Sequence, residues 1–221
     1  MRGLSYWGIF AFAITLTLAA IMWMKALQHQ WFSTMYGVWY FAGSVWLTLS
    51  TAYVIMTVLN RQRVLTHVLH DHQFYFMGTL FFAFTVFYTY VTFSQYFIIW
   101  NANMPEETIF FKMRRTGSWE AMSGVLLFGH FVLTFLVLLA RNSKRTLNVL
   151  RFATVWILAM HYTDVYWLIM PNFHKAGIAF NWVDLATLVA VMSTVALAFW
   201  MRLRKAPIAP IGDPRFKKGL E

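Results

Sequence analysis

Residues Tyr36–Leu59, YGVWYFAGSVWLTLSTAYVIMTVL, form an apolar run without a charged side chain. A helix of about 20 such residues crosses the roughly 30 Å hydrocarbon layer of a bilayer. Comparable runs lie at Leu4–Met24, Phe74–Trp100, Trp119–Ala140, Leu147–Met170 and Ile178–Met201. The sequence therefore predicts an all-α integral membrane protein, with a bundle of about six transmembrane helices over residues 1–204 and a tail over residues 205–221.

The overall composition agrees with a membrane protein. Hydrophobic residues make up 60% of the chain and charged residues 12%, whereas soluble domains carry about 25% charged residues. The net charge of +10 comes from basic residues between the apolar runs and in the tail. This pattern indicates membrane topology and argues against a nucleic-acid partner. The chain has no cysteine, which excludes disulfides, cysteine-ligated iron–sulfur clusters and a CxxCH haem attachment.

The distribution of basic residues predicts which side each loop faces. Cytoplasmic loops of membrane proteins are enriched in Lys and Arg. If the N-terminus is cytoplasmic, 13 of the 18 basic residues lie on that side, and only Lys25, Lys112, Arg114, Arg115 and Lys175 lie on the other. We therefore expect cytoplasmic N- and C-termini and a cytoplasmic tail.

Ionisable residues inside the runs are the first candidates for function, because they are costly in lipid. His161 and Asp164 are one helical turn apart, on one face of a predicted helix. A carboxylate beside an imidazole can orient the ring and exchange a proton with it. We predict that this pair accepts or relays protons. Alternatively, its members only bond to neighbouring helices.

Further polar residues extend this prediction into a path. Glu120, His130 and Asp184 are the other candidate proton carriers, and Tyr88 and Gln95 belong to a polar stripe at helical spacing. The alternative for the stripe is ordinary hydrogen bonding by membrane helices.

No metal site is expected. The run His67, His70, Asp71 and His72 lacks the second cluster that a membrane di-iron centre requires. A haem b between His130 and His161 is chemically possible, but no other sequence feature indicates one.

A longer segment resembles a known family. Residues 93–108, FSQYFIIWNANMPEET, are similar to a signature of the NrfD-like membrane subunits of alternative complex III, most closely those of the ActF type. Pro105, Glu106, Glu107 and Thr108 carry its most specific part. Further similar segments follow in the same order, namely Trp31–Val38, Tyr40–Gly43, Phe82–Phe87 and His161–Pro171.

The resemblance implies a place in an electron-transfer assembly. It implies that the chain corresponds to the C-terminal six-helix portion of such subunits, in the bacterial inner (cytoplasmic) membrane. The expected partners are a second NrfD-like subunit, haem c subunits and an iron–sulfur subunit, and a terminal oxidase is a further candidate. The haem c and iron–sulfur clusters belong to these partners, so this chain is expected to bind no redox cofactor itself. A quinone such as menaquinone is the candidate small molecule.

Three functions follow from these observations. The first is a subunit that supports quinol oxidation in a quinol:cytochrome c oxidoreductase, with His161 and Asp164 near the site of proton release. The second is a proton-conducting subunit without a quinone site. The third is a structural anchor. A quinone head group bound between these helices would favour the first, and a continuous line of waters and carboxylates without an apolar cleft would favour the second.

Overall fold

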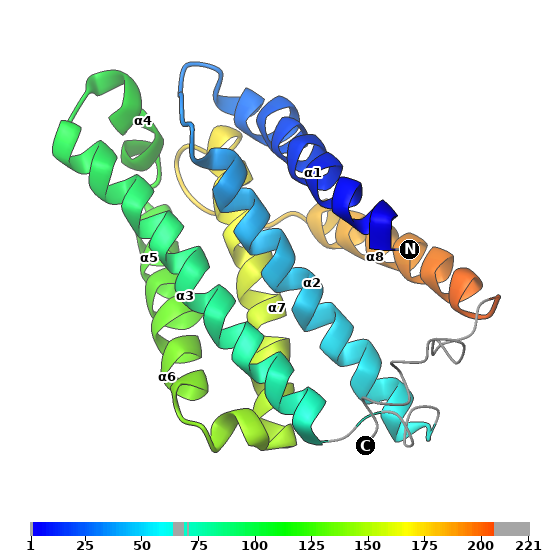
Figure 1. The fold of residues 1–221 in the computed structure, drawn as a ribbon. Coiled ribbons are helices and arrows are strands. Elements are labelled where there is room, and N and C mark those ends of the chain that lie inside the picture. The colour runs from blue at the N-terminus through cyan, green and yellow to red at the C-terminus, as the bar shows by residue number, and fades with distance from the viewer. Residues whose placement is uncertain (1, 64–68, 70, 206–221) are drawn as a thin grey trace. The chain divides into compact units, whose positions relative to one another are not determined.

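The computed structural model describes residues 2–63, 69 and 71–205, and within them every regular element is a helix (Figure 1). The all-α class is therefore confirmed. The chain forms two compact units, Met1–Ile178 and Ala179–Glu221, which we describe separately. Except for Lys205, the predicted tail lies outside the described residues, as do His67 and His70.

The first unit contains the longer part of the chain. Its principal helices are α1 (Arg2–Ala19), α2 (Tyr36–Arg61), α3 (Asp71–Ala102), α4 (Pro105–Met113), α5 (Ser118–Val125), α6 (Thr134–Leu139) and α7 (Leu147–Ile169). Short π or 3₁₀ segments complete it: η1 (Ala20–Met24), η2 (Lys25–Gln28), η3 (Leu126–Leu133), η4 (Ser143–Arg145) and η5 (Met170–Asn172). Because η3 joins α5 to α6 without a break, these three elements form one continuous helical rod.

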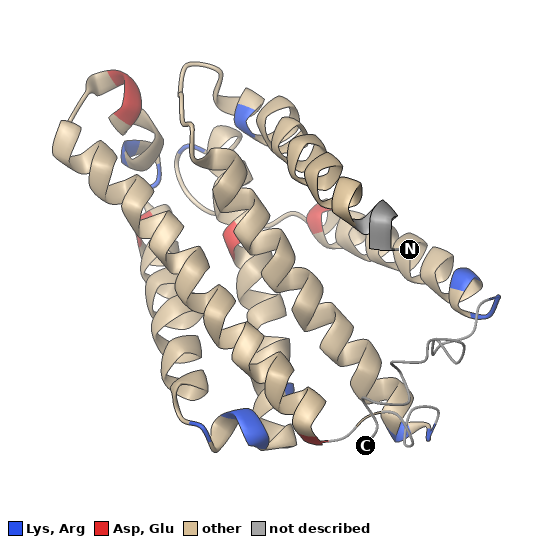
Figure 2. Cartoon of the chain, viewed as in Figure 1, with Lys and Arg blue, Asp and Glu red and all other residues tan. Residues whose placement is uncertain are grey.

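Several of these segments match a membrane environment. Five helical segments are long and apolar enough to cross a bilayer, namely Tyr6–Gln28, α2, α3, the α5–η3–α6 rod and α8. In Figure 2, Lys and Arg lie mainly at the ends of the helices, as expected for loops in water. The 23-residue helix α7 is not among the five, so a count of six spans stays a prediction, as do the sides on which the termini lie.

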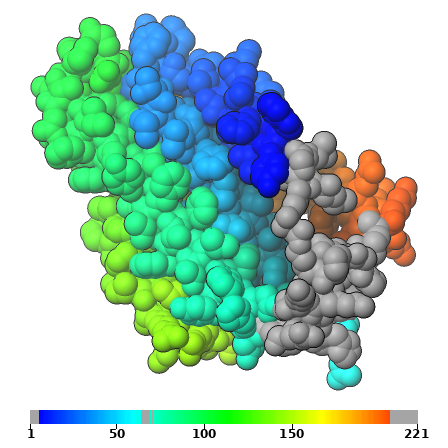
Figure 3. Space-filling model, viewed as in Figure 1, coloured from blue at the N-terminus to red at the C-terminus, as the bar shows by residue number. Residues whose placement is uncertain are grey.

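Four segments of the first unit form a ring. α2 contacts α3 and α7, and α6 contacts the same two helices from the other side. The side chains at their centre are large and buried, among them Trp46, Phe81 and Ile157. Helix α1 packs on α2, where Phe12 meets Phe41 edge to face. In Figure 3 the segments coloured from blue to green form a continuous surface.

The motif from Pro105 to Thr108 is helical, where the sequence suggested a loop. Pro105 occupies the first turn of α4, and Glu106 and Glu107 follow in the same turn. Proline fits this position because its missing N–H has no partner there, and acidic side chains complement the positive end of a helix. The local signals for this helix were therefore present in the sequence.

The second unit contains α8 (Trp182–Leu203). This helix begins at Trp182, four residues after the predicted start at Ile178. Asn181 caps it, since its side chain accepts from the N–H of Val183 at 3.2 Å while its own N–H donates to Asp184 Oδ2 at 3.2 Å. Such a reciprocal capping box fixes the first turn. None of the residues of α8 is buried.

Candidate functional site

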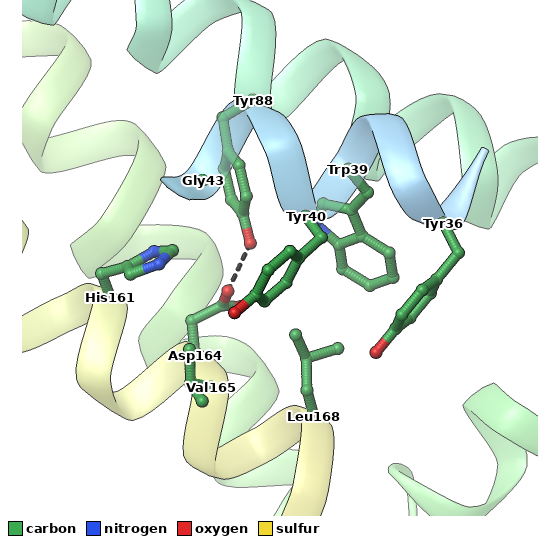
Figure 4. A pocket seen from close by; sticks show the side chains of 9 residues that line it. All are labelled: Tyr36, Trp39, Tyr40, Gly43, Tyr88, His161, Asp164, Val165 and Leu168. Atoms are coloured by element: carbon green, nitrogen blue, oxygen red, sulfur yellow. Dashed lines mark hydrogen bonds between the residues drawn. The ribbon is translucent and has the colours of Figure 1, made fainter. Parts of the chain in front are cut away.

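A buried phenol and carboxyl lie at the centre of the ring of helices. Tyr88 on α3 donates a hydrogen bond to Asp164 Oδ2 on α7 (Figure 4). Both side chains are buried. A carboxyl in such surroundings is tolerated when it is hydrogen-bonded, as here. This pair joins two segments of the chain that the sequence did not link.

Two imidazole rings lie against the pair. The His130 ring stacks on Trp46 with 4.6 Å between centroids and 5° between planes, and its centroid is 5.3 Å from that of Tyr88. The centroids of His130 and His161 are 5.9 Å apart. His130 Nε2 and His161 Nδ1 find no hydrogen-bond partner among the described residues. Each ring therefore has one buried nitrogen that no described residue binds.

The π-helical segment η3 carries His130 into this cluster. In η3 the carbonyl of Gly129 accepts from Thr134 Oγ1 at 3.3 Å and from Trp156 Nε1 of α7 at 2.8 Å. The indole donor thus ties η3 to α7. A Cβ on Gly129 would lie 2.9 Å from Met160 Sδ, so glycine permits the close approach. Short π segments often occur at functional sites because they redirect side chains.

A glycine on α2 makes room for the cluster from the opposite side. A Cβ on Gly43 would lie 2.6 Å from His161 Cε1 and 3.1 Å from Tyr88 Cε2. Real Cβ atoms are not found as close as the first of these distances, so a side chain here would displace the imidazole. Gly43 therefore sets the positions of both rings.

An apolar cleft of about 870 Å³ opens onto the pair, close to the size of a small-molecule site. Tyr88, His130 and Asp164 form part of its wall. The remaining lining is mainly aromatic and aliphatic and includes Phe93, which is 60% exposed. An apolar molecule dissolved in lipid could thus reach a phenol, an imidazole and a carboxyl in one place.

Arg114, which the sequence placed in a solvated loop, is buried at the wall of this cleft. It donates to the carbonyls of Trp167, Leu168 and Phe110 at 3.2, 2.7 and 2.8 Å, and to Gln28 Oε1 at 3.3 Å. Its guanidinium also lies 3.5 Å from the ring centroid of Phe110. These contacts join α4 to the end of α7.

Burial lowers the pKa of Arg114 to about 9, although Tyr36 and Asp164 oppose this shift. The guanidinium therefore remains charged at neutral pH. Its hydrogen-bond partners are neutral carbonyl groups, so its positive charge acts on this end of the cleft.

The other predicted path residues lie apart from the pair. Gln95 is buried and accepts from Ser33 Oγ at 2.8 Å. Glu120 is exposed at the start of α5, where it lines the cleft. Asp184 belongs to the second unit and caps α8. Thr108 is buried in α4, while Glu106 is exposed. The structure thus groups Tyr88, His130, His161 and Asp164, places Glu120 on the wall of the same cleft and leaves the other predicted residues elsewhere.

Threonine hydroxyls on α2 and α3 form hydrogen bonds within their own helices. The hydroxyls of Thr92, Thr48 and Thr51 each donate to a carbonyl four residues earlier. Ser123 is an exception, because it accepts from Trp167 Nε1 at 2.8 Å. These bonds favour the structural interpretation of the stripe, which leaves the central cluster as the candidate for proton transfer.

Within the described residues, no group of three or more His, Cys, Asp or Glu side chains is arranged to hold a metal ion. The rings of His130 and His161 pack closely, with Tyr88 in contact with both. A haem b between them would have to displace this phenol.

Reasoning from the sequence missed Trp46, Gly43 and Arg114 as parts of the site. An aromatic or a glycine in an apolar run does not reveal which way it faces, and nothing near Arg114 distinguishes it from Arg115.

The sequence was also compared with known proteins. A scan against known protein families finds no match, and a search of curated proteins finds none either.

Proposed function

We propose that this chain is an NrfD-like, ActF-type membrane subunit of alternative complex III that binds a quinol in the cleft and takes up its protons. The single observation that carries the reaction type is the apolar cleft with a hydrogen-bonded phenol–carboxyl pair in its wall. The resemblance of residues 93–108 supports the choice of complex, of its haem c and iron–sulfur partners and of the bacterial cytoplasmic membrane.

In the proposed reaction, this chain takes up the protons of the quinol and partner subunits take up its electrons. A quinol loses two protons and two electrons, and both of its O–H bonds break to leave the quinone. One proton passes to the Asp164 carboxylate, and a nearby imidazole nitrogen can take the other. The electrons leave singly to one-electron centres, haem or iron–sulfur, on partner subunits. This chain therefore positions the quinol and accepts its protons.

Each wall residue has a distinct part. Tyr88 fixes the carboxyl through its hydrogen bond. His130 is held flat against Trp46 and lines the cleft beside the pair. The aromatic side chains along the cleft suit an isoprenoid chain, because they offer apolar contact without polar groups to bury.

A pair of matched substitutions tests the proposal. Asp164→Asn keeps the size and most hydrogen bonds but cannot titrate, so quinol turnover should fall by about 10²-fold or more. Asp184→Asn makes the same change in α8 and should leave turnover near the original rate, because an amide oxygen at this position can still accept from the N–H of Asn181. Turnover is measured with a short-chain quinol in membranes whose complex is shown by native gel to be assembled. Normal turnover in assembled Asp164→Asn would refute the proposal.

A further inference from the structure

A second, much smaller cavity lies on another side of Asp164. It has a volume of about 10 Å³, which is room for about one water molecule. Tyr88 and Asp164 line both this cavity and the cleft. The phenol–carboxyl pair therefore stands between two spaces, of which one accommodates an organic molecule and the other only water.

The small cavity follows the contact between α2 and α7. Its lining residues lie in pairs along the two antiparallel helices (Figure 4). Gly43 of α2 lies beside His161 of α7. Tyr40 lies at the level of Asp164, and Tyr36 lies at the level of Leu168 (Figure 4). Each step is about one helical turn. The cavity lining thus leads from the centre of the bundle to the end where α2 begins and α7 finishes.

Two phenols lie along this route. Tyr40 is half-buried and Tyr36 is buried. A phenol hydroxyl can accept one hydrogen bond while it donates another, so it can pass a proton onward together with a water molecule. At the far end, Arg114 donates to the carbonyl of Leu168, and its positive charge disfavours a proton that remains there.

We propose that protons leave Asp164 along the α2–α7 contact, through Tyr40 and then Tyr36, to the end of the bundle at which α2 begins. This inference rests on the proposed function. A quinol in the cleft covers that face of the carboxyl, so the proton needs a second face from which to depart. The transfer is redox-neutral: an O–H bond of Asp164 breaks, an O–H bond to water or phenol forms, and the carboxylate is restored.

Tyr→Phe substitutions test this route, because they remove the hydroxyl and keep the ring. Tyr53→Phe is the matched control, since Tyr53 is a buried tyrosine of the same helix that does not line the cavity. We expect Tyr40→Phe to lower quinol turnover by about tenfold or more, with a larger solvent deuterium isotope effect and an unchanged KM for a short-chain quinol. Tyr36→Phe should act in the same direction, and Tyr53→Phe should match the parent.

The outcomes separate the two proposals when Asp164→Asn is measured alongside in the assembled complex. If Asp164→Asn is inactive while Tyr40→Phe and Tyr36→Phe both turn over at the parent rate, the route is wrong and the proposed function stands. If Asp164→Asn turns over normally, the carboxyl is not the proton acceptor, and both proposals are overturned.

Discussion

Helices α7 and α8 have similar lengths, 23 and 22 residues, but opposite characters. α8 is apolar enough to be a candidate span, and none of its residues is buried. α7 does not reach that level of hydropathy, yet it buries Thr154, His161 and Asp164 among its apolar residues.

The difference shows that hydropathy and function point to different helices. A helix surrounded by lipid must be apolar on every side. One surrounded by protein can carry polar groups, provided that they face partners. Two of the polar residues that lower the hydropathy of α7, His161 and Asp164, belong to the candidate site, so a helix outside the candidate spans carries half of that site.

The largest expected effect comes from removing the same kind of apolar side chain in both helices. Ile157 in α7 is fully buried and Leu197 in α8 is 59% exposed. Ile157→Ala should destabilise the chain by about 2 kcal/mol, the lower end of the range for buried aliphatic residues, because lipid is itself apolar and only packing is lost. Leu197→Ala should change stability by less than about 0.5 kcal/mol. Thermal unfolding in detergent measures both, and equal losses would contradict the contrast between the helices.

A smaller loss of stability is expected when the contacts at the end of α7 are removed. The buried guanidinium of Arg114 makes these contacts. Arg114→Met removes the donors to the carbonyls of Trp167 and Leu168. We expect a loss of about 1 kcal/mol, the lower end of the cost of leaving a buried polar group unpaired, and easier proteolysis within α4. Arg115→Met is the control, because Arg115 is the adjacent residue and is exposed. Matching stability curves for the two variants would show that the buried guanidinium does not anchor α7.

Much of the fold could be predicted from the sequence, because long apolar runs have few ways to satisfy their backbone groups in lipid. The start of α8 was misjudged by four residues, since Ile178 continues the apolar run although Asn181 supplies the cap. The helix α4 was not predicted either, although Pro105, Glu106 and Glu107 are typical of a helix start.

The site was only half predictable. His161 and Asp164 stood out because ionisable groups are rare in apolar runs. Their partners Tyr88 and His130 were candidates, but the sequence did not say that four segments bring them together. The role of Gly43 depends on a tertiary contact with His161, and the burial of Arg114 depends on the packing of α4. Neither contact can be predicted from the neighbouring residues in the sequence.

Photoaffinity labelling with an azido-quinone tests the central claim most directly, because it reports where the head group binds. In the assembled complex, we predict covalent adducts on the cleft residues Phe93, Leu127 and Phe131, suppressed by excess unmodified quinone. Labelling confined to α8, or labelling of the cleft that excess quinone does not suppress, would contradict a quinol site at the Tyr88–Asp164 pair.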